Sequence, residues 1–282
     1  RIVEVTLRPF RKILKPIIII DGFDPGDKRK VLPCDYEPLE YKVGESRSIS
    51  EVMKYDANKE KDLIMELQNK GYDVIIVNQP TYSVMNTAPH QKVNDGTIGS
   101  RKVDGGGDYI ERNGLNLVTL IKRINDTLTI NGSNEKLVIV GPSMGGQISR
   151  YALAWMEKNN IPHNTRLWIS VDSPHLGANI PLGAQAEINL LKKGNDEAKI
   201  FYNNQLGSVA AKQQLIEFHK EGDGYHTVDQ SLLNARTISQ GFSTSSGSTF
   251  FQNFYNNQFS NGLPNSKGYP VNLRKIALTN GS

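Results

Sequence analysis

Cysteine is nearly absent from this 282-residue sequence, which contains only Cys34. A single thiol excludes an internal disulfide framework. Long apolar runs are missing too, since no stretch approaches the roughly 18–20 apolar residues that a membrane span requires. An excess of one charge is also lacking, because 33 basic and 29 acidic residues leave a net charge of +4. The basic residues are scattered, so the sequence gives no support for nucleic-acid binding.

Hydrophobic residues make up 38% of the chain and charged residues 22%. This balance provides enough apolar surface for a core, and α/β folds of this length often form one unit. The first residue is Arg1, and no signal-peptide pattern follows it. We therefore expect a mature form or a fragment.

The most informative stretch is Glu135–Arg150, which reads EKLVIVGPSMGGQISR. Its apolar run Leu137–Val140 predicts a short strand buried on both faces. Gly141–Gly145 then forms a G-x-S-x-G motif around Ser143, and a helix is predicted from Gln147 onward. A strand that turns sharply into a helix through this motif is typical of a nucleophile elbow.

The chemistry of such an elbow explains its glycines. The turn is strained, and a side chain two residues before or after the serine would collide with the neighbouring strand or helix. The helix behind Ser143 also directs its positive N-terminal end at an oxyanion formed there. With these residues in place, the chain resembles the α/β-hydrolases of the lipase and esterase type.

A second strand and its loop extend the resemblance. Residues Ile17–Ile20 predict a buried parallel strand. The loop Asp21–Gly26 stands where lipases carry their oxyanion loop, although Asp21 replaces the usual histidine. The resemblance implies that the backbone N–H groups of Phe23 and Met144 hold the oxyanion. An ordinary Gly/Pro turn is the alternative for this loop.

Strands and helices alternate along the chain, which predicts a mostly parallel, doubly wound α/β sheet with right-handed crossovers. Further helices are predicted at Lys59–Asn69, Tyr109–Leu128 and Gln147–Lys158, and further strands at Arg1–Phe10, Tyr72–Asn78, Arg166–Asp172 and Leu273–Ser282. We expect the last of these to be a core strand. Residues 1–181 and 271–282 are assigned to the α/β-hydrolase core, and residues 182–270 to a cap or lid insertion.

The polar stretch Gln79–Gly107 ends in a run of glycines between Asp104 and Asp108. Paired aspartates among glycines suggest a cation site, but the spacing of an EF-hand or of a calcium-binding repeat is missing. We therefore predict a flexible loop in which Asp108 caps the next helix.

Within the proposed cap, helices are predicted at Ala184–Leu191 and Ser208–Lys220. A polar segment, Ser243–Phe259, carries five aromatic residues. In this fold such an insertion usually covers the active site, so the aromatic side chains could grip an acyl chain or face a lipid surface. The alternative, which we favour, is that they pack the cap onto the body of the protein.

The resemblance also implies a catalytic triad in the chain order Ser, Asp or Glu, His. Asp172 ends a predicted strand at the sheet edge where active sites form, so it is the candidate acid. Loop capping is the alternative role of Asp172. Chain order allows His219 and His226, which follow both Ser143 and Asp172. His226 is the candidate base because it lies in a predicted loop, and His219, on a predicted cap helix, is the second choice.

The other histidines fit the role of base less well. His175 lies in a Ser-Pro-His-Leu-Gly loop and resembles a structural histidine of lipases. His163 precedes a strand, which places it at the wrong edge of the sheet, and His90 precedes the nucleophile. The usual acid and base of this fold follow strands at and beyond Ile276–Thr279, and the sequence ends at Ser282.

Triad residues are therefore expected beyond Ser282, and the chain as given is predicted to be an incomplete or poorly active hydrolase. The competing prediction is a compact triad of Ser143, Asp172 and His226. The mechanism implied by the resemblance is two-step acyl transfer on a small-molecule or lipid ester, without a cofactor or metal. Two alternatives stay open: a hydrolase-like binding domain without a complete triad, and an acyltransferase or amidase that uses the same serine.

Overall fold

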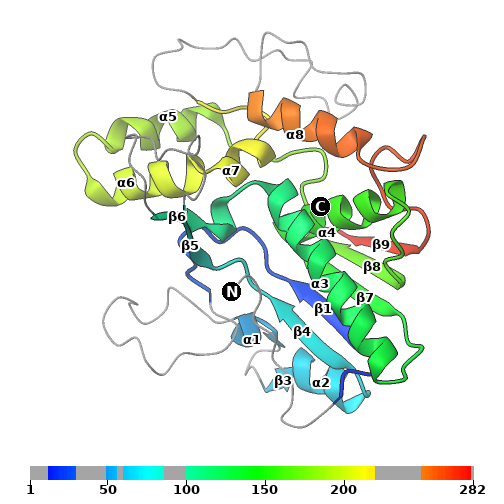
Figure 1. Cartoon of the computed structure of the whole chain (residues 1–282). Coiled ribbons are helices and arrows are strands. Elements are labelled where there is room, and N and C mark those ends of the chain that lie inside the picture. The colour runs from blue at the N-terminus through cyan, green and yellow to red at the C-terminus, as the bar shows by residue number, and fades with distance from the viewer. Residues whose placement is uncertain (1–11, 30–48, 56–59, 86–99, 220–248, 281–282) are drawn as a thin grey trace.

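The computed structural model describes residues 12–29, 49–55, 60–85, 100–219 and 249–280. Its centre is a five-stranded sheet in the order β4-β1-β7-β8-β9, and every neighbouring pair is parallel (Figure 1). The strands are β1 (Pro16–Ile20), β4 (Asp73–Val77), β7 (Leu137–Pro142), β8 (Thr165–Val171) and β9 (Arg274–Leu278). Ile17 pairs with both Val74 and Val138, so the isoleucine strand lies inside the sheet, as predicted. The strand predicted at Arg1–Phe10 falls outside the described residues.

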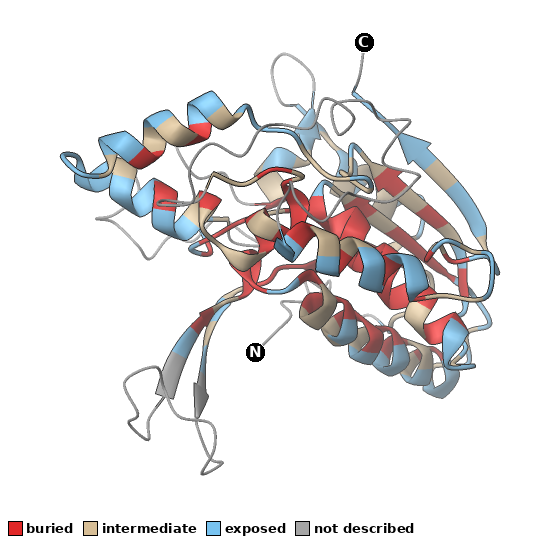
Figure 2. Ribbon diagram, turned by 90° about the horizontal axis from the view of Figure 1, so that it is seen from above, coloured by how far each residue is buried: buried red, intermediate tan, exposed pale blue. Residues whose placement is uncertain are grey.

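Alternation along β1 distributes apolar side chains to both faces of the sheet. Ile18 and Ile20 pack with the helices α3 (Ile110–Ile130) and α4 (Met144–Lys158). Ile17 and Ile19 pack on the opposite face, where they meet the helices α1 (Ile49–Val52) and α2 (Leu63–Asn69). Figure 2 shows the buried residues concentrated between these layers. The predicted doubly wound arrangement is therefore confirmed.

The start of α3 differs from the prediction for Asp108. The helix begins at Ile110, and Asp108 forms an ion pair with Arg112 rather than capping the helix. The backbone N–H of Ile110 donates instead to the side-chain oxygen of Gln213, 2.8 Å away. Because a distant glutamine satisfies this N–H group, the local aspartate is not needed as a cap.

The polar stretch before α3 is not simply a loop. Strands β5 (Thr81–Met85) and β6 (Ser100–Asp104) form an antiparallel pair, and the 3₁₀ turn η1 (Gly105–Gly107) follows. A Cβ atom on Gly106 would collide with the backbone carbonyl of Asp24. The glycine run thus allows η1 to lie directly against the loop that follows β1. A second small sheet pairs β2 (Lys54–Tyr55) with β3 (Lys61–Asp62).

In the described part of the region assigned to a cap, helices lie together along one side of the molecule (Figure 1). They are α5 (Leu182–Leu191), α6 (Asp196–Ile200), the π-helix η2 (Phe201–Leu206), α7 (Val209–Gln214) and α8 (Thr249–Ser260). The helix predicted at Ser208–Lys220 ends early, because Leu215 is extended and forms a β-bridge with Ala178.

Two aromatic residues of α8 pack inward. Phe251 and Phe254 are each 2% exposed, and Phe254 belongs to the main core cluster with side chains of the sheet. Phe250 and Phe259 are 39% and 46% exposed. The favoured interpretation of the aromatic segment, packing against the body, therefore holds for half of these phenylalanines.

Strand β9 is an edge strand rather than the predicted core strand. It pairs with β8, but four of its five residues are exposed. Among the described strands, none pairs with its other side. The apolar residues Ile276 and Leu278 suggested burial, but burial depends on what covers the strand.

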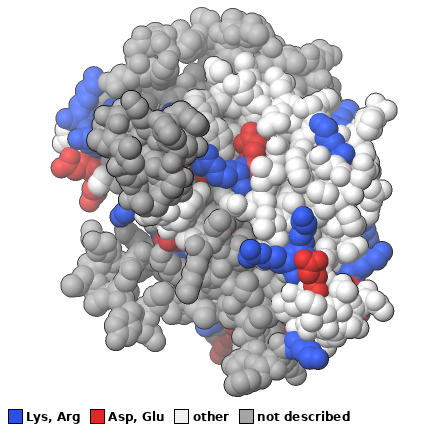
Figure 3. All heavy atoms as spheres, viewed as in Figure 1, with Lys and Arg blue, Asp and Glu red and all other residues white. Residues whose placement is uncertain are grey.

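None of the helices in the described ranges is long and apolar enough to cross a membrane. On the face shown in Figure 3, the visible Lys, Arg, Asp and Glu side chains are dispersed and of both signs.

Candidate active site

Ser143 occupies the turn between β7 and α4. Its backbone has φ 51° and ψ −128°, in a region that side-chain-bearing residues rarely adopt. The N–H of Ser143 donates to the carbonyl oxygen of Val171 over 2.8 Å, which ties the turn to the neighbouring strand β8. The helix begins at Met144, three residues before the predicted start, so Ser143 itself is the residue that enters the helix.

Close packing explains the glycines around Ser143. A Cβ atom on Gly141 would lie 2.5 Å from the carbonyl oxygen of Gly145, and one on Gly145 would lie 2.6 Å from that of Ile20. A Cβ atom on Gly146 would collide with the hydroxyl of Ser173. These are the collisions with helix and strand that the spacing of the motif predicts.

The loop after β1 lies beside the exposed serine. A Cβ atom on Gly22 would lie 3.1 Å from the Cβ of Ser143. Within this loop, the N–H of Asp21 donates to the carbonyl oxygen of Val77 over 2.9 Å. In the described part of the chain, the N–H of Phe23 has no such partner.

Met144 is the first residue of α4, where backbone N–H groups have no acceptor inside the helix. The N–H groups of Phe23 and Met144 are therefore among those that the loop and the start of the helix leave available near Ser143. Their predicted role as oxyanion donors stays a prediction.

Buried carboxylates hold the loop behind Ser143. Asp21 and Asp24 are 8% and 4% exposed, and both face Arg29. Burial raises the pKa of Asp21, although the charge of Arg29 opposes the shift. Burial likewise raises the pKa of Asp24 to about 6, against a hydrogen bond from the backbone N–H of Arg29.

Asp172, the predicted acid, is exposed and follows β8 directly. Its φ is 47°, and its backbone N–H donates to the carbonyl oxygen of Leu278 over 2.7 Å. One carboxylate oxygen accepts a long bond of 3.4 Å from the N–H of Asn280. Among the described residues, no histidine bonds to this carboxylate. Asp172 thus lies at the same sheet edge as Ser143, and its role as the acid stays a prediction.

His175 packs among neighbouring side chains, in line with the structural role that its loop suggested. Its Nε2 lies 2.8 Å from the hydroxyl of Ser170, and its ring packs edge-on against Trp168 and Tyr269. Burial, together with the nearby charge of Arg150, lowers the pKa of His175 to about 3. A neutral imidazole held in this way serves packing rather than proton transfer to Ser143.

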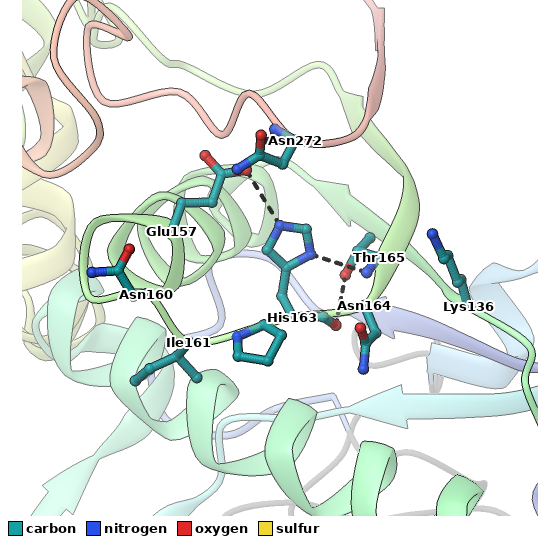
Figure 4. A pocket seen from close by; sticks show the side chains of 9 residues that line it. Lys136, Glu157, Asn160, Ile161, His163, Asn164, Thr165 and Asn272 are labelled. Atoms are coloured by element: carbon teal, nitrogen blue, oxygen red, sulfur yellow. Dashed lines mark hydrogen bonds and ion pairs between the residues drawn. The ribbon is translucent and has the colours of Figure 1, made fainter.

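His163 lies where β8 begins, at the edge of the sheet opposite Ser143. Its Nε2 lies 3.3 Å from the carboxylate of Glu157, and its Nδ1 accepts a hydrogen bond from the N–H of Thr165 (Figure 4). These side chains line an open cavity of about 390 Å³. The predicted placement of His163 away from the nucleophile is therefore correct.

His219 is tied to the cap helices by its backbone. Its N–H donates to the side-chain oxygen of Gln185, and its carbonyl oxygen accepts from the hydroxyl of Tyr202. His226, the predicted base, and His90 lie outside the described residues. Across the described ranges, no cluster of three or more His, Cys, Asp or Glu residues is arranged to hold a metal ion.

Sequence reasoning missed Arg150, which is buried in the helix behind Ser143. Its guanidinium donates to the carbonyl oxygens of His175, Lys267 and Gly268 and stacks 3.6 Å from the ring centre of Tyr269. Burial lowers the pKa of Arg150 to about 10. The apolar pattern of α4 gives no signal for these contacts, because most of the partners lie over 100 positions away.

A parallel sheet flanked by helices, with an exposed serine in a positive-φ turn between strand and helix, defines an α/β-hydrolase fold. The sequence profile of the PGAP1-like alpha/beta domain family, which is of the α/β-hydrolase type, matches residues 103–248. This match spans just over half of the 282 residues, and the chain belongs to this family.

Solved structures similar to this chain include lipase BlEst2 of Bacillus licheniformis. The mature form is 16% identical with a TM-score of 0.32, and the match covers 71% of this chain and 58% of the lipase. The propeptide form is 15% identical with a TM-score of 0.33, over 74% of this chain and 33% of the lipase. A bromoperoxidase from Bacillus anthracis is 13% identical with a TM-score of 0.34, over 94% and 73% of the two chains. The chain thus spans less than two thirds of the lipase, and no curated protein sequence matches it.

Proposed function

We propose that this protein is a serine hydrolase that cleaves carboxylic esters through an acyl-enzyme on Ser143. The observation that carries the proposal is the placement of Ser143, which is exposed in a strained turn at the start of α4 and next to Gly22. A hydroxyl held in this way is accessible to a substrate. The backbone N–H groups nearby can stabilise the negative charge that develops on the substrate.

The reaction proceeds in two steps. Ser143 Oγ attacks the carbonyl carbon of the ester while a histidine takes the serine proton, and the carbonyl oxygen becomes an oxyanion held by the N–H groups of Phe23 and Met144. The ester C–O bond then breaks, and the alcohol leaves with the proton from the histidine. Water, deprotonated by the same histidine, attacks the acyl-enzyme and releases the acid, and Ser143 regains its proton.

In this proposal Asp172 is the acid and His226 the base. The position of Asp172 supports its role, because it follows β8, the strand whose Val171 carbonyl holds the N–H of Ser143. Residues 182–270 form the cap over residues 1–181 and 271–282, and its apolar side chains bind the acyl part of a small-molecule or lipid ester.

The test combines covalent labelling with turnover. Wild-type protein is expected to react with a fluorophosphonate probe and to hydrolyse short-chain p-nitrophenyl esters. Ser143→Ala should abolish both, with turnover reduced about 10⁴–10⁶-fold, since triad members act as a unit. Ser260→Ala, at the exposed end of α8, is the matched control and should change neither reaction.

His226→Ala and His219→Ala separate the two candidate bases, and Asp172→Asn tests the acid. Labelling and turnover that survive Ser143→Ala would refute the proposal. Labelling of Ser143 without ester turnover, but with acyl transfer to an added amine or alcohol, would identify an acyltransferase instead.

A further inference from the structure

Arg29 connects three points of the loop that lies beside Ser143. Its Nε lies 3.2 and 3.1 Å from the two carboxylate oxygens of Asp21, and its terminal nitrogen donates to the carbonyl oxygen of Phe23 over 2.9 Å. Its backbone N–H donates to the carboxylate of Asp24 over 2.8 Å. One residue thus fixes both ends of the segment from Asp21 to Asp24.

These bonds constrain the peptide group that carries the N–H of Phe23. On one side, Asp21 is held by the bond from its carboxylate to Arg29 and by the bond from its N–H to the carbonyl oxygen of Val77. On the other side, the carbonyl of Phe23 is held by the guanidinium. With its neighbours fixed on both sides, this peptide group has little freedom to rotate.

The rest of the loop is braced by η1 and by the last residue of β6. Asp24 packs so closely against Gly106 that no side chain fits between them, and a carboxylate oxygen of Asp104 accepts the N–H of Gly26 over 2.6 Å. Burial disfavours the charged form and raises the pKa of both Asp104 and Asp24. The backbone N–H groups that donate to these carboxylates oppose this shift and favour the ionised form. Arg29 forms an ion pair with Asp21, and the side chain of Arg29 is 31% exposed.

We propose that Arg29 is a positioning residue for ester hydrolysis, which holds the Asp21–Asp24 segment so that the N–H of Phe23 faces the oxyanion formed at Ser143. This inference rests on the proposed function. An oxyanion donor acts on the transition state more than on the bound ester, so its misplacement lowers kcat and leaves KM nearly unchanged. Displacement by about 1 Å or loss of one donor lowers turnover by about 10²-fold or more.

The experiment compares Arg29→Gln and Arg29→Lys with wild-type protein in ester hydrolysis and fluorophosphonate labelling. Arg29→Gln should lower kcat and the labelling rate about 100-fold, with KM within about twofold. Arg29→Lys keeps the charge but loses the two-point contact, so its kcat should lie between those of wild type and Arg29→Gln. The control is Arg166→Gln, an exposed arginine bonded to Tyr72 at the opposite edge of the sheet, which should match wild type.

Hydrogen exchange measures the loop independently of catalysis. In Arg29→Gln, amides of residues 21–24 should exchange faster, while those of residues 137–150 should not change. Asp21→Asn provides a second variant that keeps the size of the side chain, and it should loosen the same residues.

Three outcomes would overturn the inference. If Ser143-dependent hydrolysis is present and Arg29→Gln keeps kcat within about twofold, Arg29 has no positioning role, although the proposed function stands. If exchange accelerates throughout the protein, Arg29 supports the fold in general rather than the loop. If wild-type protein neither labels nor hydrolyses esters, the proposed function fails and this inference fails with it.

Discussion

At the scale of single residues, the backbone geometry of Ser143 depends on the neighbouring glycines Gly141 and Gly145. A positive φ at a serine costs about 1–3 kcal/mol and persists only where the surroundings enforce it. Here the bond from the Ser143 N–H to Val171 and the tight packing of Gly141 and Gly145 supply that constraint. The strained turn is therefore a property of the sheet around the serine rather than of the turn alone.

We predict that Gly145→Ala destabilises the protein by about 1–3 kcal/mol, the usual cost of forcing extra atoms into a packed core. The new Cβ would lie 2.6 Å from the backbone oxygen of Ile20, which cannot move without displacing β1. Unfolding in urea measures the effect.

Gly183→Ala in α5 is the matched control, because no atom lies within 4 Å of the position that a Cβ would take there. This variant should be neutral or more stable by up to about 1 kcal/mol, since alanine favours helices. Equal stability of Gly145→Ala and wild type would show that the turn is not packed as described.

Single residues also show how far sequence reasoning reaches. Ser143 could be identified because the motif and its flanking strand and helix are contiguous in the chain. Arg29 could not, since its contacts with Asp21 and Phe23 follow from the path of a loop that has no periodicity. The catalytic base is a matter of tertiary placement too. Within residues 1–282 chain order favours His219 and His226, and it does not decide between these two and a base beyond Ser282.

At the scale of elements, periodicity predicted the helices and strands that are defined by contiguous residues. The apolar spacing of α3 predicted both ends of this helix to within two residues, and the isoleucines of β1 predicted a buried strand. The pairing of β5 with β6 was missed, because a strand partner more than ten residues away leaves no periodic signal. The early end of α7 has a similar cause, since Leu215 leaves the helix to pair with Ala178.

Glu157, near the end of α4, joins this helix to the segment before β9. Its carboxylate accepts hydrogen bonds from the backbone N–H groups of Val271 and Asn272, at 2.8 and 2.7 Å, and pairs with His163. Burial alone would raise the pKa of Glu157, but these donors outweigh it, and the pKa is lowered from 4.5. A carboxylate with a lowered pKa contributes stability above its unfolded-state pKa and loses it as the pH falls through the folded value.

We predict that Glu157→Ala lowers the free energy of unfolding at pH 7 by about 2–4 kcal/mol, because the backbone N–H groups of Val271 and Asn272 and the buried His163 lose their acceptor. Glu157→Gln keeps one acceptor oxygen and should lose less. Because glutamine does not titrate, the stability difference between wild type and Glu157→Gln should shrink as the pH falls below about 4.5.

Urea unfolding across the pH range measures both effects. Glu135→Ala, which alters an exposed carboxylate before β7, is the control and should stay within about 0.5 kcal/mol of wild type. A difference between wild type and Glu157→Gln that stays constant with pH would contradict the assigned role of the carboxylate.

At the scale of the whole molecule, the helices assigned to the cap and the sheet share one core. Ala210 of α7 and Phe254 of α8 belong to the same apolar cluster as Ile18 and Ile139 of the sheet. Polar contacts reinforce this packing, since Gln213 of α7 bonds to the start of α3 and Gln258 of α8 to the backbone of Gln147. We therefore expect the described helices of the proposed cap to unfold together with the sheet, although a lid is often a separable unit.

The substitution Phe254→Ala tests this expectation. Removing a phenylalanine that is 2% exposed should lower stability by about 3–5 kcal/mol, through lost apolar burial and the cavity left behind. Phe259→Ala is the matched control in the same helix, because Phe259 is 46% exposed and its loss should cost about 1 kcal/mol or less.

Urea unfolding followed by the fluorescence of Trp155 and Trp168 reports on the body, and hydrogen exchange of residues 209–214 reports on α7. If cap and body form one cooperative unit, Phe254→Ala shifts both signals to the same lower midpoint. An earlier transition seen only in the exchange of α7, with the fluorescence midpoint unchanged, would mean that residues 182–270 fold as an independent unit.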